Sequence, residues 1–494
     1  MASSFIRKIK TGSGATAVQV VYKRGREVTS ICHIGSAHSD AELEILLSLA
    51  HKIKLQGQLS LFEEKSPEIY LERTYSQLLV DALASVYDAL GFDILDDEIF
   101  KYLVLARIIE PASKLDTIRI LDELGIDAPS YSSVARCLLR VVKRDYRSSL
   151  SKQCFAYVSP DSLSLILYDV TTLYFEAQKE DGYRVPGLSK ERRLDPQIKI
   201  GLLVDSSGFP LEVMSFEGNC AEVKTIIPVL ENFKARYQLK NITVTADAAM
   251  LSAANIGELE KLGFNYIIAS RLAKTPYEIV EYINETGAVL DDLQIFESSI
   301  TVTIDSKRRK RRVIYQYRAK RAALDLANIE KTLDKAKKIV QGQASMRRNR
   351  FLKLSGAKKE INYDLLEEAK KKAGIKGYVT NLDVGAQYVI DAYHQLFEVE
   401  KSFRMSKSDL EARPIFHHKR SSIEAHLTIV FAALAIARFI EGKTGISIRK
   451  FLHKLKPLKT GVILVGGTEI ELKPRMPTEV SELLDLLGTM KCGY

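Results

Sequence analysis

Three acidic residues stand where carboxylates could bind a metal ion. Asp169 interrupts LILYDVTTLYF (165–175), a run of branched and aromatic residues that is typical of a buried strand. A buried carboxylate is costly unless its charge is compensated, either by a metal ion or by the hydrogen bonds of a turn or bulge. Asp247 ends the alternating run ITVTAD (242–247) and precedes a helix-forming segment, so it could equally be a helix N-cap.

The third acid, Glu400, lies in AYHQLFEVEKSFRMSK (392–407), which has helical periodicity. Tyr393, Glu400 and Lys407 are seven residues apart, a spacing that keeps side chains on one face of a straight helix. Glu400 interrupts a largely apolar face there. A solvated charged stripe is the alternative interpretation.

Asp169, Asp247 and Glu400 together would suit phosphoryl transfer assisted by two metal ions. Mg²⁺ prefers carboxylate and water oxygens, and Mn²⁺ could substitute for it. Two such ions activate the attacking oxygen and stabilise the leaving one, so no side-chain nucleophile is needed. The sequence has no G-x-S-x-G, P-loop, H-E-x-x-H or kinase signature that would support another chemistry.

The elements predicted around the two aspartates form an α/β unit. Residues 163–175, 197–205 and 209–218 are predicted to be successive strands, the last two joined by a turn at 206–208. A helix, a strand, a helix and a strand are predicted to follow, up to residue 270. This is the element order of an RNase H-like fold with a mixed sheet. Ligands collect at the carboxyl ends of strands in α/β sheets, so Asp169 and Asp247 could share a cation.

The rest of the sequence divides by its periodicity around this core. A hairpin with a basic turn near Arg24 characterises the N-terminus, and helical periodicity begins at about Glu68, with interruptions at Pro111 and Pro129. We predict a small β-rich basic module at 1–66, a helical domain at 67–158, the first part of the core at 159–273, a mainly β insertion at 274–384, the second part of the core at 385–445, and a C-terminal tail with one strand pair at 446–494.

Composition indicates a folded, multidomain protein with a polyanionic partner. The 494 residues are 46% hydrophobic, which is enough for at least one large core. Lys and Arg outnumber Asp and Glu by 72 to 62, and the net charge of +10 favours nucleic acid as the partner. Either the N-terminal module or the helical domain could contact it. Five scattered cysteines form no C-x-x-C pair, so neither a zinc module nor a disulfide framework is indicated.

The sequence indicates neither export by a secretory signal nor a membrane span. The charged N-terminus lacks an apolar signal region. The longest apolar run, 427–440, is broken by Thr428 and Arg438 and is shorter than a membrane span. We interpret it as a buried core helix and expect the protein in a reducing cytoplasm.

The chain resembles transposases of bacterial insertion sequences in the group with the signature Tyr-x2-Arg-x3-Glu-x6-Lys. The signature positions are Tyr393, Leu396, Glu400 and Lys407, and the segments 107–115, 189–219, 245–252 and 399–427 are similar to blocks of this family. The resemblance implies an RNase H-like catalytic core of the Asp-Asp-Glu class, with Asp169, Asp247 and Glu400 as its catalytic and metal-binding residues.

The same resemblance implies a cut-and-paste DNA transposase. Such an enzyme hydrolyses a strand at each element end and joins the released 3′ hydroxyl to target DNA. Its partners would be terminal inverted repeats and target duplex, bound by a homodimer on paired ends in a bacterial nucleoid. Two alternatives stay open: a DNA-binding remnant that regulates transposition without catalysis, and an RNase H-like nuclease without strand transfer.

The residues that handle DNA are where this chain departs from the signature. Leu396 occupies the Arg position. Arg404 on the same helix could substitute for that Arg, although its spacing does not match. The resemblance implies that Tyr393 and Lys407 contact DNA near its 5′ phosphate.

Basic clusters elsewhere could extend a DNA-binding surface. They lie at 307–312, 347–350 and 417–420. The third follows the Glu400 helix closely, so we expect His417, Lys419 and Arg420 to contact phosphates. His426, on the next and apolar helix, is expected to be a hydrogen-bonded core residue.

Overall fold

The computed structural model describes most of the chain. The described residues are 2–12, 14–55, 69–158, 163–175, 180–187, 195–238, 241–248, 252–270, 272, 274–287, 289–304, 307–345, 347–355, 358–413, 415–465 and 467–488. Parts of the family blocks at 189–194 and 249–251 therefore lie outside them. The chain divides into two compact units, one with residues 1–78 and 457–477, the other with residues 79–456 and 478–493.

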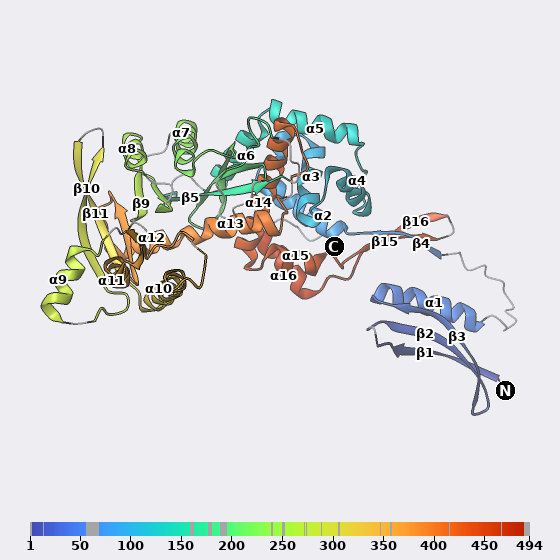
Figure 1. Cartoon of the computed structure of the whole chain (residues 1–494). Coiled ribbons are helices and arrows are strands. Elements are labelled where there is room, and N and C mark those ends of the chain that lie inside the picture. The colour runs from blue at the N-terminus through green and yellow to red at the C-terminus, as the bar shows by residue number, and fades with distance from the viewer. Residues whose placement is uncertain are drawn as a thin grey trace. The chain divides into compact units, whose positions relative to one another are not determined.

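The first unit contains two small antiparallel sheets (Figure 1). In one, β1 (Ala2–Lys10), β2 (Thr16–Arg24) and β3 (Glu27–Ala37) pair in order, and α1 (Asp40–Leu55) covers the side chains of Val18 and Val20. The predicted hairpin is β2–β3. The second sheet has the order β16-β15-β4 and comprises β4 (Ile69–Tyr75), β15 (Thr460–Val465) and β16 (Thr468–Leu472).

The start of the helical region was predicted wrongly. Helical periodicity was expected from Glu68, but Ile69–Tyr75 is a strand that pairs with Thr460–Val465. The segment IYLERTY is rich in β-branched and aromatic residues, which suits a strand. The predicted strand pair of the tail is present as β15–β16.

Helices begin the second unit. They are α2 (Gln77–Ala89), the 3-10 turn η1 (Phe92–Leu95), α3 (Glu98–Ile109), α4 (Lys114–Glu123), α5 (Tyr131–Lys143) and α6 (Tyr146–Val158). Pro111 and Pro129 fall between helices, as predicted, because proline is poorly tolerated inside them. The buried Asp97 side chain caps α3 and accepts hydrogen bonds from Arg140 and Tyr146, which ties α3 to α5 and α6.

A mixed sheet forms the core of the second unit, as the predicted order of elements indicated. β5 (Leu165–Tyr174), β6 (Gln197–Asp205) and β7 (Pro210–Glu217) are antiparallel, whereas β8 (Thr243–Ala246) and β9 (Asn265–Ser270) continue from β5 in parallel. The 3-10 turn η3 (Glu222–Lys224), α7 (Ile226–Tyr237) and α8 (Ala253–Lys261) connect these strands. The order β7-β6-β5-β8-β9 confirms the RNase H-like fold class.

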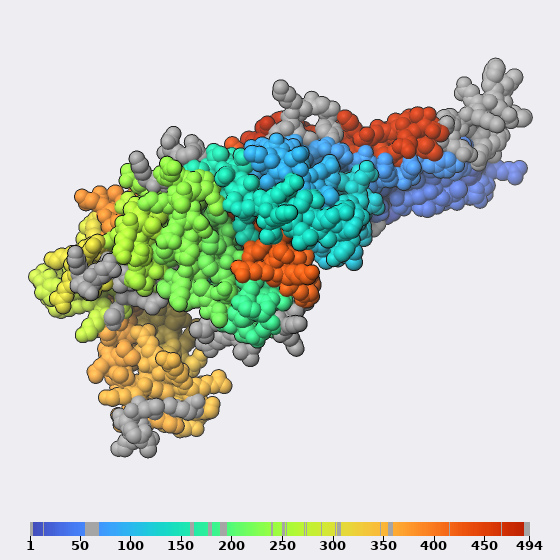
Figure 2. All heavy atoms as spheres, turned by 90° about the horizontal axis from the view of Figure 1, so that it is seen from above, coloured from blue at the N-terminus to red at the C-terminus, as the bar shows by residue number. Residues whose placement is uncertain are grey.

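The segment 274–384 extends this sheet beyond β9. It contains α9 (Tyr277–Thr286), β10 (Ile295–Ile304), β11 (Lys307–Tyr317), α10 (Ala319–Val340), β12 (Leu352–Ser355), β13 (Lys358–Ile361), α11 (Tyr363–Lys371) and β14 (Ile375–Thr380). β14 pairs with β9 and with β11, so β10, β11 and β14 belong to the main sheet. Ile329, Phe351 and Leu366 are buried in a separate small core within this segment, which Figure 2 draws in yellow and orange.

Helices complete the second unit. They are α12 (Ala386–His394), α13 (Leu396–Ser408), α14 (Arg420–Thr444), α15 (Ile448–Leu455) and α16 (Thr478–Leu487). α14 is long and apolar enough to cross a membrane by length and composition, but 94% of its apolar window is buried inside the protein. The prediction of a buried core helix is therefore confirmed. Helical residues 386–407 form two helices rather than one, because the helix is interrupted at Gln395.

Candidate active site

Asp169 and Asp247 occupy matching positions on neighbouring strands. β5 and β8 run parallel, with Tyr168 paired to Ala246, so the next residue of each strand is one of the two aspartates. The pairing of β5 with β6 stays regular through Asp169, which excludes a bulge there. Asp169 is half-buried and Asp247 is exposed. The two aspartates thus lie at the same level of neighbouring strands, as the sequence predicted, although β5 continues past Asp169 to Tyr174.

Asp247 does not cap the helix that follows it. The α8 N-cap is Ser252, whose side chain accepts a hydrogen bond from the backbone N–H of Asn255. The Asp247 carboxylate instead accepts a hydrogen bond from the N–H of Ala248, at 2.6 Å. The capping alternative for this aspartate is therefore excluded for α8.

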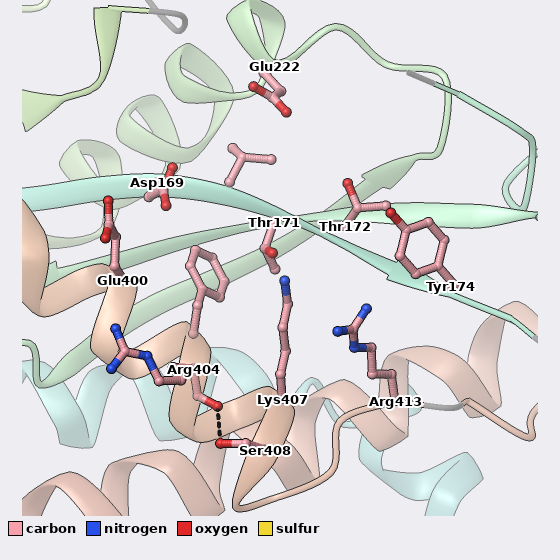
Figure 3. A pocket seen from close by; sticks show the side chains of 12 residues that line it. Asp169, Thr171, Thr172, Tyr174, Glu222, Glu400, Arg404, Lys407, Ser408 and Arg413 are labelled. Atoms are coloured by element: carbon pink, nitrogen blue, oxygen red, sulfur yellow. Dashed lines mark hydrogen bonds between the residues drawn. The ribbon is translucent and has the colours of Figure 1, made fainter. Parts of the chain in front are cut away.

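Glu400 comes to Asp169 from the other side of a cavity. α13 packs against β5, and the cavity between them has a volume of about 470 Å³. Asp169 lies on its strand side and Glu400 on its helix side, and Figure 3 shows both side chains at the lining of this cavity. Ser402, two residues after Glu400, holds α13 in place by donating a hydrogen bond to the carbonyl oxygen of Gly208, at 2.7 Å.

The remaining lining of this cavity is mainly cationic and polar. Lys407, Arg404 and Arg413 supply positive charge on the side of α13, and Glu222 stands on the opposite side of β5 (Figure 3). The sequence predicted Lys407 and Arg404 as DNA contacts but missed Arg413 and Glu222. Neither residue belongs to a helical or alternating sequence pattern that would have indicated its place in the site, because each lies in or beside a short loop.

Tyr393 does not share a helix with Glu400, contrary to the prediction. It belongs to α12, is 6% exposed, and lies outside the lining of the cavity. The interruption at Gln395 cancels the argument from seven-residue spacing for Tyr393, whereas Glu400 and Lys407 remain on α13 and both line the cavity. Burial, followed by the charges of Asp247, Tyr378 and Glu400, raises the pKa of Tyr393. Tyr393 is therefore close to both acids without facing the cavity.

Lys376 of β14 is a second residue that the sequence did not indicate. Its ammonium lies 4.1 Å from the centre of the Tyr393 ring, a cation–π distance. Burial, together with the charges of Arg321 and Arg318, lowers the pKa of Lys376 to about 8, and Asp247 and Glu400 oppose this shift. Asp247 and Glu400 thus act on the same ammonium and the same phenol, which places them in one electrostatic neighbourhood.

Leu396, at the Arg position of the signature, is 8% exposed. It starts α13 with its side chain in the protein interior. A leucine at this position supplies no positive charge to the site.

The residues at 417–420 that were predicted to contact phosphates lie outside the cavity that Asp169 and Glu400 line. Burial, followed by the charges of Lys114 and Arg107, lowers the pKa of His417 to about 4, so this imidazole is neutral near pH 7. Lys419 and Arg420 are exposed at the start of α14, and Arg420 lies 4.5 Å from the ring centre of Tyr183. His426 is buried beside the carbonyl oxygen of Ala412, at 3.2 Å, which confirms its predicted core position.

The donor chemistry of the acids fits hard divalent cations. Asp169, Asp247 and Glu400 offer carboxylate oxygens, the ligands that Mg²⁺ prefers. Within the described parts of the chain, however, no three Asp, Glu, His or Cys side chains are gathered into a complete metal site. Asp169 and Asp247 lie at matching positions of the sheet and Glu400 faces Asp169 from α13, without a closed set of ligands among them.

Comparisons with known proteins identify a family. A family model described as the transposase DDE domain matches residues 160–436, a range that includes all three acids. No curated protein matches the chain. Among solved structures, the piggyBac transposase synaptic complex with hairpin DNA, determined by cryo-electron microscopy, is 10% identical, with 77% of this chain and 70% of that chain covered and a TM-score of 0.37. A TM-score this low does not by itself establish a common fold.

Proposed function

The chain belongs to the transposase DDE domain family, and we propose that Asp169, Asp247 and Glu400 are its catalytic and metal-binding residues. The observation that carries this proposal is the convergence of the three acids. Two follow paired residues of β5 and β8, and the third faces Asp169 across a cavity. A carboxylate at each of these places suits a divalent-cation site, because the positive charge of the cation would offset the repulsion between the acids.

The proposed reaction is DNA cleavage and strand transfer. Water attacks a phosphodiester phosphorus at the element end, and the bond to the 3′ oxygen breaks to release a 3′ hydroxyl. That hydroxyl then attacks a phosphodiester of target DNA, which joins the element to it and releases the target's own 3′ hydroxyl. Two bound Mg²⁺ ions would activate the attacking oxygen and stabilise the leaving one.

This chain's residues would bind and orient the DNA strand for both steps. Asp169, Asp247 and Glu400 would hold the cations against the scissile phosphate. Lys407, Arg404 and Arg413 line the same cavity and would neutralise flanking phosphates. Two copies of the chain, one for each end of the element, would form the working complex.

The test is cleavage of a plasmid that carries the two ends of the DNA segment encoding this chain. In the presence of Mg²⁺, the unmodified protein should nick the ends and join them to target DNA. Asp169→Asn, Asp247→Asn and Glu400→Gln should each abolish nicking while leaving DNA binding largely intact. Glu231→Gln, which changes an exposed acid on α7, is the matched control and should retain activity.

The outcomes separate the proposed function from its alternatives. Nicking without strand transfer would identify a nuclease. Specific binding of the ends without nicking by the unmodified protein would identify a regulator that has lost catalysis. Retained nicking in the Asp169→Asn protein would overturn the assignment of the acids.

A further inference from the structure

Lys376 and Arg318 lie at the end of the sheet where β8 and β9 end, and Arg321 follows on α10. β14 runs antiparallel to β9, which is parallel to β8, so β14 begins at the end of the sheet where β8 and β9 end. Lys376 is the second residue of β14. β11 is antiparallel to β14 and pairs Tyr317 with Ile375, so Arg318, which follows Tyr317, leaves the sheet at the same end.

Arg318 and Arg321 act on groups that Asp247 and Glu400 also affect. Arg321 and Arg318 both lower the pKa of Lys376, and both lower that of Tyr378, which burial raises overall. Arg321 also opposes the rise in the pKa of Tyr393. The cations therefore share one neighbourhood with Tyr393, and through it with Asp247 and Glu400.

Two aromatic rings hold the Lys376 side chain in position. Its ammonium lies 4.1 Å from the ring centre of Tyr393 and 5.6 Å from that of Tyr378, and the two ring centres are 5.0 Å apart. Such rings favour a nearby cation but cannot accept its hydrogen bonds as a phosphate oxygen would. The ammonium therefore keeps capacity to donate to an anionic ligand.

Positive charge continues from this end of the sheet onto α10. Arg318 and Arg321 are exposed, and Arg321 pairs with Asp325 at 3.5 Å. Arg321 also lines a second cavity of about 320 Å³ together with Arg350, Lys372 and Asp325. The buried Leu396, by contrast, leaves α13 without a cation at the corresponding signature position.

We propose that Lys376, Arg318 and Arg321 form a phosphate-binding cluster that positions the DNA strand against Asp247 and Glu400. The cluster supplies from β14 and α10 the positive charge that Leu396 does not supply from α13. Lys376 is a positioning residue in this arrangement, because it orients the strand and does not take part in bond making. The inference rests on the proposed function of the acids.

Binding is measured with a duplex from one end of the DNA segment that encodes the chain. Every binding variant carries Asp169→Asn, so that cleavage does not interfere. Lys376→Met keeps the length of the side chain and removes its charge, whereas Lys376→Arg keeps the charge. The double variant Arg318→Gln/Arg321→Gln changes exposed residues and so protects the test against a folding defect. Lys331→Gln/Lys335→Gln, which removes two exposed charges from α10, is the matched control.

The expected result is a change in salt dependence that loss of packing alone would not cause. Lys376→Met should bind about tenfold more weakly and reduce the slope of log affinity against log salt by about 0.9, as for one phosphate contact. Lys376→Arg should restore the slope. The Arg318/Arg321 variant should lower the slope by more than the Lys331/Lys335 control does.

Cleavage by the same variants with Asp169 intact gives a second readout. Lys376→Met should lower the rate at limiting protein more than at saturating protein, because strand binding is weakened. If Lys376→Met and the Arg318/Arg321 variant match the control in salt slope and in cleavage, the cluster is overturned. If the unmodified protein does not nick DNA while the slopes still change as expected, the proposed function fails and the phosphate-binding cluster stands.

Discussion

Arg438 of α14 donates a hydrogen bond from Nη2 to Oε2 of Glu398 on α13, at 3.0 Å. The same guanidinium donates to Glu441, at 2.9 Å, and to the backbone carbonyl of Ser207 in the β6–β7 turn. The Arg438 side chain is 8% exposed. Glu398 precedes Glu400 by two residues, so this guanidinium fixes the helix that carries the third acid against both α14 and the sheet.

The contact between Arg438 and the β6–β7 turn requires glycine at position 208. Gly208 has φ +86°, which side chains other than glycine rarely adopt, and a Cβ atom there would collide with the Arg438 guanidinium. The predicted turn at 206–208 is therefore more than a connection between strands. Residues of both α13 and α14 contact this turn.

Replacing Arg438 by Met should destabilise the protein and lower its activity. The change leaves Glu398 and Glu441 without their shared partner and should cost about 2 kcal/mol of unfolding free energy. Cleavage should fall as well, because α13 would no longer be held at the position that brings Glu400 to Asp169. Chemical denaturation and a nicking assay measure the two effects.

Arg449→Met is the control for this prediction. Arg449 also pairs with a carboxylate, Asp409, at 2.5 Å, but its side chain is 67% exposed. Exposed ion pairs contribute less than about 1 kcal/mol, so this variant should be close to the unmodified protein. Equal stability and equal cleavage in the two variants would contradict the role of Arg438.

The protein should lose stability below about pH 6.5 because of His417. Burial, then Lys114 and Arg107, lowers the pKa of this imidazole to about 4, whereas an unfolded histidine has a pKa of about 6.5. Between these values the unfolded chain binds a proton that the folded chain does not, so protons favour unfolding. The contribution of His417 is fully present above about pH 6.5 and is lost as the pH falls towards 4.

The measurement is the free energy of unfolding at about pH 7 and about pH 5 for the unmodified protein and His417→Gln. The substitution should reduce the difference in unfolding free energy between the two pH values by on the order of 1–2 kcal/mol, after allowance for partial solvent screening. His453→Gln, on α15, is a control with the same chemical change. An identical pH dependence in all three proteins would show that His417 is not held neutral by its surroundings.

Local sequence patterns were sufficient to predict the strands of the core, whereas they left alternatives open for each of the three acids. Residues 197–205 and 265–270 were predicted as strands because their apolar runs end at turn residues, and both are strands within those bounds. The order of these elements gave the sheet, and the sheet brought Asp169 and Asp247 to matching positions. The family signature added Glu400, whose local pattern alone left a solvated stripe open.

What the sequence could not predict depends on contacts between distant segments. The interruption at Gln395 has no proline or glycine to mark it, so one helix was predicted where α12 and α13 form. β4 is a strand because residues 460–465 pair with it. Lys376 meets Tyr393 because β14 joins the sheet beside β9, more than 100 residues away in sequence, and no local pattern carries that information.

The side chains of the basic run 307–312 should divide into two groups with different functions. It forms β11, in which successive side chains point to opposite faces. Arg311 and Arg309 both pair with Glu260, with Arg311 Nε 2.6 Å and Arg309 Nη1 3.1 Å from its carboxylate oxygens. Arg308 and Lys310 alternate with these residues and are exposed, so they point to the other face.

Arg308→Gln/Lys310→Gln should therefore weaken DNA binding without changing stability. If both side chains contact phosphates, the slope of log affinity against log salt should fall by about 1.8. Arg309→Gln/Arg311→Gln removes the same charge but leaves Glu260, whose side chain is only 13% exposed, without its two cationic partners. This variant should cost about 1–3 kcal/mol of unfolding free energy with a smaller change in slope. Because the two variants have the same net charge, a general electrostatic effect would change the slope equally in both, and that result would rule out a DNA contact specific to one face of β11.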